Sequence, residues 1–167
     1  MRGTNSVAYF RLRIDAQSWF SEIAEKPPFR VKFDVYYLCL LAGLASGRAT
    51  ELVGAAYPAT DLVEKFVEDY RPASRLLIGL LVTAELGNSG IDVSEKAQVR
   101  ALFKRLVDSE SPNSLTELGM RRMNAYASGG YEYLAEQRDM KPYTAEEFIQ
   151  SYTGLIEKAF ENAAAVD

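Results

Sequence analysis

Residues 34–46 read Asp-Val-Tyr-Tyr-Leu-Cys-Leu-Leu-Ala-Gly-Leu-Ala-Ser, and this stretch decides the fold. Its side chains are apolar on nearly every side, so a helix made from it has no polar face to turn toward water. Such a helix is stable only when other helices surround it. The stretch therefore predicts the central core helix of a helical protein.

Working outward from this stretch, apolar residues recur at helical period in most of the remaining sequence. In chain order, further helices are expected at residues 16–25, 62–70, 73–86, 94–108, 114–128, 131–136 and 145–160. The helix at 62–70 is expected to begin behind the cap Thr60-Asp61, and the helix at 73–86 behind Pro72. Pro27-Pro28 is expected to end the first helix, because neither residue can donate a backbone hydrogen bond.

Start and stop motifs bound several of these helices. The segments 114–117 and 144–147 have the S/T-x-x-E spacing of a capping box, in which two side chains satisfy backbone N–H groups reciprocally. Gly129-Gly130 predicts the end of the helix that begins at the first box, although the glycines can also interrupt one longer helix. Residues 7–14 partly alternate apolar and basic side chains, which leaves a short strand open as an alternative.

The predicted fold class is therefore all-α, a compact orthogonal bundle of six to seven helices, with a short N-terminal strand as the open alternative. A length of 167 residues fits a single helical domain over 1–167. Within it, residues 1–28 are the segment that can pack separately or mediate contacts. No repeat with a period of 20–50 residues is present, which disfavours a solenoid.

Composition excludes several kinds of chemistry. The sequence has no histidine and one cysteine, Cys39, which lies in the apolar stretch and is expected to be buried and inert. The commonest general base is missing, and a zinc site of the usual Cys/His kind cannot be built. Carboxylate pairs such as Glu146-Glu147 are expected to face solvent. We therefore expect no enzyme activity, no cofactor and no metal.

Neither a secretion signal nor a membrane span is predicted. The N-terminus lacks the apolar segment of a secretion signal, and the longest apolar run, 76–84, is about half of the roughly 20 residues that cross a bilayer. A cytoplasmic location without membrane contact is expected. The net charge of −4 disfavours a general nucleic-acid-coating protein. The charge is uneven along the chain, which leaves room for a local basic patch.

The first candidate DNA contact is a row of basic residues. Lys96, Arg100 and Lys104 stand at four-residue spacing and therefore share one helix face, with Arg105 beside them. Phosphate groups could bind there. The alternative interpretation is a solvated polar face whose charge is offset by the acidic residues at 95 and 108.

Arg121 and Arg122 form a second candidate DNA contact. Glu117 lies one turn before Arg121 and is expected to offset its charge. The interpretation of this pair as structural is therefore favoured over DNA contact.

Aromatic and basic residues near the first half of the chain are candidates for a partner interface. Tyrosine and tryptophan are enriched in binding hot spots, so an exposed subset would mark an interface. The candidates are Tyr9, Phe10, Trp19, Arg71 and Arg75. The two arginines flank the start of an apolar helix, where the helix dipole disfavours cations. They are expected to pair with the acidic residues at 68–69 or with an external acidic group.

Three stretches carry a family resemblance: residues 33–38 (FDVYYL), 111–120 (SPNSLTELGM) and 123–132 (MNAYASGGYE). Together they resemble the small helical accessory proteins encoded with bacterial DNA phosphorothioation and related anti-phage defence systems. The resemblance covers residues 30–160, contains no catalytic signature and transfers no active-site residue. It implies a non-enzymatic subunit of a larger DNA-modifying or DNA-restricting assembly, which either bridges partner proteins or touches DNA.

The leading expectation is an interaction or scaffold subunit of a bacterial DNA-modification or DNA-restriction complex, with larger protein subunits as partners. The alternative is a DNA-binding module that contacts phosphates through the basic helix face. A homo-oligomer is compatible with both. An enzyme that uses carboxylates and a metal would require an inward-facing acidic cluster, which the sequence does not display.

Overall fold

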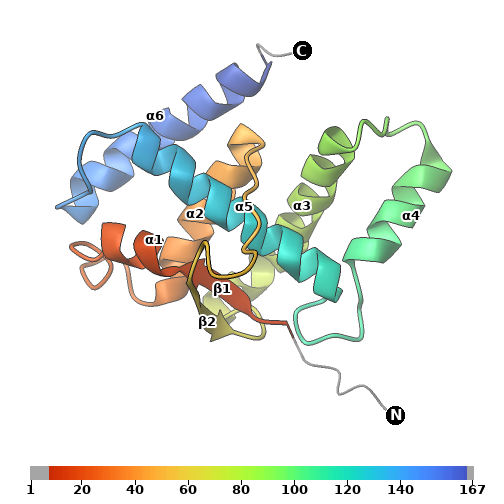
Figure 1. Ribbon diagram of the computed structural model, residues 1–167, viewed down its shortest axis with the longest axis horizontal. Helices are drawn as coiled ribbons and strands as arrows, with labels where there is room; N and C mark the ends of the chain where they lie inside the picture. Colours follow the sequence, from red (N-terminus) through yellow and green to blue (C-terminus); the bar gives the residue numbers. More distant parts are fainter. Residues whose placement is uncertain (1–7, 165–167) are drawn as a thin grey trace.

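The computed structural model describes residues 8–164, which form six α-helices, one 3-10 helix and a two-stranded antiparallel sheet (Figure 1). The elements in chain order are β1 (Phe10–Arg13), α1 (Ile14–Trp19), α2 (Lys32–Ser46), β2 (Ala59–Val63), η1 (Glu68–Ala73), α3 (Ser74–Asn88), α4 (Lys96–Leu106), α5 (Glu117–Glu136) and α6 (Ala145–Ala164). The predicted mostly helical class is confirmed. The strand left open at residues 7–14 is confirmed as β1, and β2 is an element that the sequence analysis did not predict.

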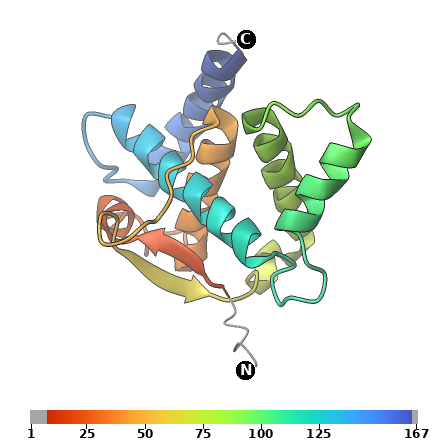
Figure 2. The same cartoon turned by 45° about the vertical axis from the view of Figure 1, so that its right-hand side comes forward.

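The centre of the fold is the contact between α2 and α5, which pack along each other (Figures 1 and 2). The stretch 34–46 forms α2, as predicted, and Phe33, Tyr36 and Leu40 are buried. Cys39 is also buried, as predicted, and burial raises the pKa of its thiol well above the usual range. The apolar run thus becomes the helix that the other elements surround.

The helix α5 departs from the prediction at both ends. It continues through Gly129 and Gly130 to Glu136, so the predicted stop is wrong and the alternative of one longer helix is confirmed. The predicted cap at Ser114 is also wrong. Thr116 is the cap instead, and its Oγ1 accepts a hydrogen bond from the N–H of Gly119 at 3.0 Å.

Residues 62–70 do not form the predicted helix. Residues 59–63 pair antiparallel with β1, and the Nε of Arg11 lies 2.9 Å from an Oδ of Asp61 across the two strands. The segment 68–73 is a 3-10 helix that leads directly into α3. Pairing with a strand about fifty residues earlier has overridden the local helical spacing.

Buried amide side chains tie β1 to α5. The Oδ1 of Asn124 accepts hydrogen bonds from the backbone N–H of Arg11 at 3.0 Å and from the hydroxyl of Tyr36 at 2.8 Å. Its Nδ2 donates to the carbonyl of Tyr9 at 3.0 Å. A second buried amide, Asn113, donates to the backbone just before β1 and just after β2. The sheet is therefore held to the helices through its backbone.

The N-terminal segment shares the main core. α1 is shorter than the predicted helix at 16–25, and a series of turns follows it. Phe10, Leu12, Phe20 and Ile23 belong to the same buried cluster as α2 and α5. The described part of residues 1–28 therefore packs with the rest of the protein.

The last helix, α6, begins as predicted but with half of the predicted capping box. The Oγ1 of Thr144 accepts a hydrogen bond from the N–H of Glu147 at 3.3 Å. The carboxylate of Glu147 does not turn back to the cap, because it forms two hydrogen bonds with Arg138 at 3.0 and 2.9 Å. Arg138, nine residues earlier in the chain, has replaced the backbone N–H of the cap as the partner of this carboxylate.

At one edge of the molecule, α3 and α4 pack on each other, and α4 is outermost (Figures 1 and 2). Their contact is a small second apolar cluster made of Val82, Leu86, Leu102 and Leu106. Among the described residues, α4 is supported mainly by this narrow contact and by the start of α5, and most of its surface is exposed.

The start of α2 depends on the carboxylate of Asp34. Its Oδ2 accepts hydrogen bonds from the backbone N–H groups of Arg30 at 2.7 Å and Val31 at 3.0 Å, and its Oδ1 accepts one from the hydroxyl of Tyr70. Burial acts to raise the pKa of Asp34, but these hydrogen bonds stabilise the charged form more strongly. The pKa is therefore lower than the ordinary value.

This lowered pKa predicts a pH dependence of stability. Because the folded state binds the proton less tightly than the unfolded state, the contribution of Asp34 is complete above about pH 5 and is lost as the pH falls through the folded pKa. We expect Asp34→Asn to lower the free energy of unfolding by about 1–2 kcal/mol at pH 7 and by much less at pH 2.5. Urea unfolding of both proteins at these two pH values measures the difference. An equal loss of unfolding free energy at both pH values would contradict the lowered pKa of Asp34.

Candidate interaction surfaces

The basic row predicted on the helix at 94–108 lies on α4. Lys96, Arg100 and Lys104 are all exposed and follow one another along the helix, over roughly 12 Å of its axis. Arg105 is also exposed but points about 100° away from Lys104 around the helix. The opposite, buried face holds α4 against α3. The structure thus keeps three of the four predicted cations in one line.

The acidic residues expected to offset this row are turned elsewhere. Glu95 accepts a hydrogen bond from the backbone N–H of Asp92 at 3.3 Å, and Asp108 accepts one from the N–H of Glu110 at 2.9 Å. Within residues 8–164, none of the four basic side chains of α4 lies within 4.0 Å of a carboxylate. The helix itself contains no acidic residue. Its positive charge is therefore not neutralised by close ion pairs in this part of the chain.

Arg121 and Arg122 differ from this row. The Nε of Arg121 lies 3.7 Å from Glu51, and Arg122 pairs with Glu51 at 2.9 Å and with Glu85 at a still shorter distance. The expected partner Glu117 is not used. Both arginines thus hold α5 to other elements, and neither extends the row on α4.

The pair of Arg122 and Glu85 is largely shielded from water. The side chain of Arg122 is 20% exposed and that of Glu85 is 10% exposed. The hydroxyl of Tyr126 donates a hydrogen bond to the same carboxylate at 3.3 Å. Burial and the charge of Glu85 raise the pKa of Tyr126 to about 12. This cluster joins α3, α5 and the loop after α2.

The predicted partner interface is only partly on the surface. Phe10 is fully buried and makes edge-to-face contacts with Phe33 and Tyr36, so the folded protein does not present it to a partner. Trp19 is half-buried and packs against aromatic rings of the core, among them Phe20. These two aromatic side chains therefore belong to the core or its margin. Tyr9, in contrast, is 40% exposed.

Arg71 and Arg75 are both exposed, and neither lies within 4.0 Å of the carboxylates at positions 68 and 69. Arg71 and Tyr9 line a shared shallow hollow of about 380 Å³. Its floor includes Phe66. The structure therefore brings together two of the five predicted interface residues.

An exposed apolar face of α3 escaped the sequence analysis. Leu76 is 64% exposed and Leu80, one turn later, is 37% exposed. Gly79 and Thr83 lie beside them on the same exposed side. The sequence analysis predicts an apolar helix here but does not say which of its sides is exposed. The small residues at these two positions, which interrupt the run at helical spacing, were the available indication of an open face.

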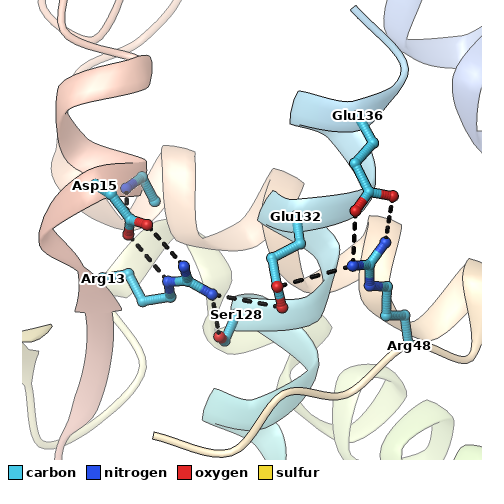
Figure 3. Close-up of polar contacts among 7 residues, drawn as sticks. Arg13, Asp15, Arg48, Ser128, Glu132 and Glu136 are labelled. Carbon is cyan, nitrogen blue, oxygen red and sulfur yellow. Dashed lines mark hydrogen bonds and ion pairs between the residues drawn. The ribbon is translucent and has the colours of Figure 1, made fainter. Parts of the chain in front are cut away.

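A chain of alternating charges joins β1 to α5 (Figure 3). Arg13 forms two hydrogen bonds with Asp15, at 2.9 and 2.7 Å, and one with the hydroxyl of Ser128 at 3.1 Å. Its Nη1 lies 3.4 Å from Glu132. Glu132 in turn lies 3.7 Å from Arg48, which follows α2.

The chain ends at Glu136, which Arg48 binds through two hydrogen bonds of 2.6 and 2.9 Å (Figure 3). The guanidinium of Arg13 also lies 4.3 Å from the ring centre of Tyr57. Because the side chain of Arg13 is only 7% exposed and each cation contacts two carboxylates, this cluster stabilises the fold. The sequence analysis did not single out Arg13, because its partners on α5, Ser128 and Glu132, are distant in the sequence.

Residues 8–164 contain neither a candidate metal site nor a candidate membrane span. No three His, Cys, Asp or Glu side chains are grouped so that they could bind a metal ion. No helix of this region has the length and apolar character needed to cross a lipid bilayer. Comparisons of the chain with known protein families, with curated proteins and with solved structures gave no match.

Proposed function

We propose that the protein is a non-enzymatic interaction subunit of a bacterial DNA-modification or DNA-restriction complex, and that it binds a larger protein of that complex through the exposed face of α3. The family resemblance of residues 30–160 supports the kind of complex. The apolar surface of α3 supports the mode of binding.

The observation that carries the proposal is the pair Leu76 and Leu80. Single exposed apolar side chains are ordinary on protein surfaces. These two lie one turn apart, about 6 Å along the helix, so they form one continuous apolar surface. The small side chains beside them leave room for a partner to approach the backbone of α3. Burying both leucines against a partner would contribute about 2–4 kcal/mol before the costs of association.

The helix α6 carries apolar residues of similar exposure but in a different arrangement. Ile149 is 38% exposed and Phe160 is 60% exposed. They are separated by eleven positions, roughly 16 Å along the helix, and exposed Thr153 and Gly154 lie between them. They are separate apolar side chains, and they provide a control matched in exposure.

The proposal predicts that one double substitution abolishes partner binding. The tagged protein is purified from the cell in which it occurs, and the bound proteins are identified by mass spectrometry. We expect the wild-type protein to retain a DNA-modifying or DNA-restricting protein, and Leu76→Glu/Leu80→Glu to lose it. Glutamate is a good helix former, and both positions face solvent, so this variant is expected to fold. Circular dichroism checks that point.

The matched control is Ile149→Glu/Phe160→Glu, which is expected to retain the same partner. If the α6 variant lost the partner and the α3 variant retained it, the assignment of the binding surface to α3 would be wrong. Capture only of further copies of this chain, or of proteins unrelated to DNA modification or restriction, would contradict the proposed function.

A further inference from the structure

We propose that α4 is a contact surface for double-stranded DNA, and that Lys96, Arg100 and Lys104 bind the phosphates of its backbone. This inference is independent of the partner face, since α4 can fail to bind DNA while α3 still holds a protein. It rests on the charge, exposure and shape of α4.

Half of the basic side chains outside α4 in the described part of the chain are neutralised by carboxylates of the protein itself. Seven of the fourteen basic side chains that residues 8–164 contain outside α4 form close ion pairs with carboxylates, and they include Arg13, Arg48 and Arg122. The cations of α4 form none there, although Glu95 and Asp108 flank them in the sequence. A row of unneutralised cations is complementary to a regular array of negative charges. Double-stranded DNA presents one such charge about every 1.7 Å along its axis.

The shape of α4 favours a duplex over a single strand. Sites for single strands are grooves that track the backbone and stack successive bases on aromatic side chains. α4 is instead a helix at the outer edge of the molecule (Figures 1 and 2). Phe103 is its one aromatic residue and is 48% exposed. An outward-facing helix with a line of cations fits along the backbone of a duplex.

The rest of the protein limits the strength of this contact. The chain has a net charge of −4, and the exposed acidic residues Asp92 and Glu110 lie close to the two ends of α4 in the sequence. The expected affinity is that of non-specific binding, with a dissociation constant of roughly 10–100 µM at physiological salt. Such a contact orients DNA within an assembly and does not hold it alone.

Three neutralised phosphates predict a defined salt dependence. The logarithm of the binding constant should fall with the logarithm of the salt concentration with a slope of about −2.7, so affinity falls about 40-fold between 50 and 200 mM NaCl. In Lys96→Glu/Arg100→Glu/Lys104→Glu, we expect affinity at 50 mM NaCl to fall by about tenfold or more and the slope to approach zero. Fluorescence anisotropy of the purified full-length protein with a labelled 30-base-pair duplex measures both quantities.

The matched control is Lys26→Glu/Lys32→Glu/Lys158→Glu, which changes the net charge equally at exposed positions outside α4. We expect this control to keep most of the salt slope. A second variant, with glutamine at the three α4 positions, preserves helix propensity and should also lose the slope. The proposal would be overturned if the control lost as much of the salt slope as the α4 variant. It would also be overturned if the glutamine variant kept the salt slope of the wild-type protein. Tighter binding of a single strand or a polyglutamate peptide than of the duplex at the same salt concentration would overturn it as well.

Discussion

Replacing Gly130 with alanine is expected to destabilise the folded state strongly. A Cβ atom at this position would lie 1.7 Å from the carbonyl oxygen of Cys39, and one at Gly43 would lie 1.8 Å from the carbonyl oxygen of Tyr126. Both obstacles are backbone atoms, so no side chain can rotate away. The helices α2 and α5 would have to separate, which opens the core at its centre. We expect Gly130→Ala to lower the free energy of unfolding by roughly 4 kcal/mol or more.

Urea unfolding followed by circular dichroism measures this loss, and Gly154→Ala is the control. Gly154 also lies inside a helix, but apart from its chain neighbours and the backbone of its own helix, no atom of residues 8–164 lies within 4 Å of the place where its Cβ would be. Alanine there should stabilise the protein by about 0.5–1 kcal/mol, because glycine loses more backbone entropy on folding. A Gly130→Ala protein as stable as the wild type would show that α2 and α5 do not approach as closely as described.

Substitution of Arg122 by methionine is expected to have the second-largest effect. Methionine keeps much of the side-chain volume but leaves Glu85 without its closest cation in a mostly buried position. An uncompensated buried charge typically costs about 3–5 kcal/mol. The loss should appear as a lower urea midpoint with an unchanged slope, since the surface exposed on unfolding stays the same.

The double variant Glu85→Gln/Arg122→Met tests the cause of that loss. Glutamine removes the charge and can still accept the hydrogen bond from Tyr126. We expect the double variant to recover more than half of the lost stability, because replacing both partners of a buried pair is far less costly than removing one. If it is as unstable as Arg122→Met alone, the packing of the arginine matters more than the buried charge.

The parts of the fold that the sequence predicted are those governed by local pattern. The apolar stretch at 34–46 could form only a buried helix, and α2 follows it closely. The segment at 62–70 has equally clear helical spacing, yet its first two residues belong to β2 and its last three to η1. The two segments differ because the second one pairs with β1, a strand about fifty residues away. Local spacing does not reveal such a pairing. Gly129 and Gly130 were misleading for a related reason. Gly130 allows the close approach of α2, Gly129 allows that of the backbone just after α2, and neither glycine ends α5.

The difference between local spacing and contacts with distant segments also explains which surface residues could be predicted. The row on α4 needed only a four-residue spacing, and the structure keeps it intact. The partners of Arg121 and Arg122 lie on a distant loop and on α3, so their ion pairs could not be predicted from Glu117 one turn away. The face of α3 is open because no element within residues 8–164 covers Leu76 and Leu80. A strongly apolar sequence cannot distinguish that situation from complete burial.

The most direct test of the central proposal is a calorimetric titration of the purified partner protein with the wild-type chain and with Leu76→Glu/Leu80→Glu. If α3 carries the binding, the double variant should bind at least about 100-fold more weakly, since each leucine would act as a hot spot worth about 2 kcal/mol. Ile149→Glu/Phe160→Glu should bind like the wild type. Equal affinity of the α3 variant and the wild-type protein would contradict the account.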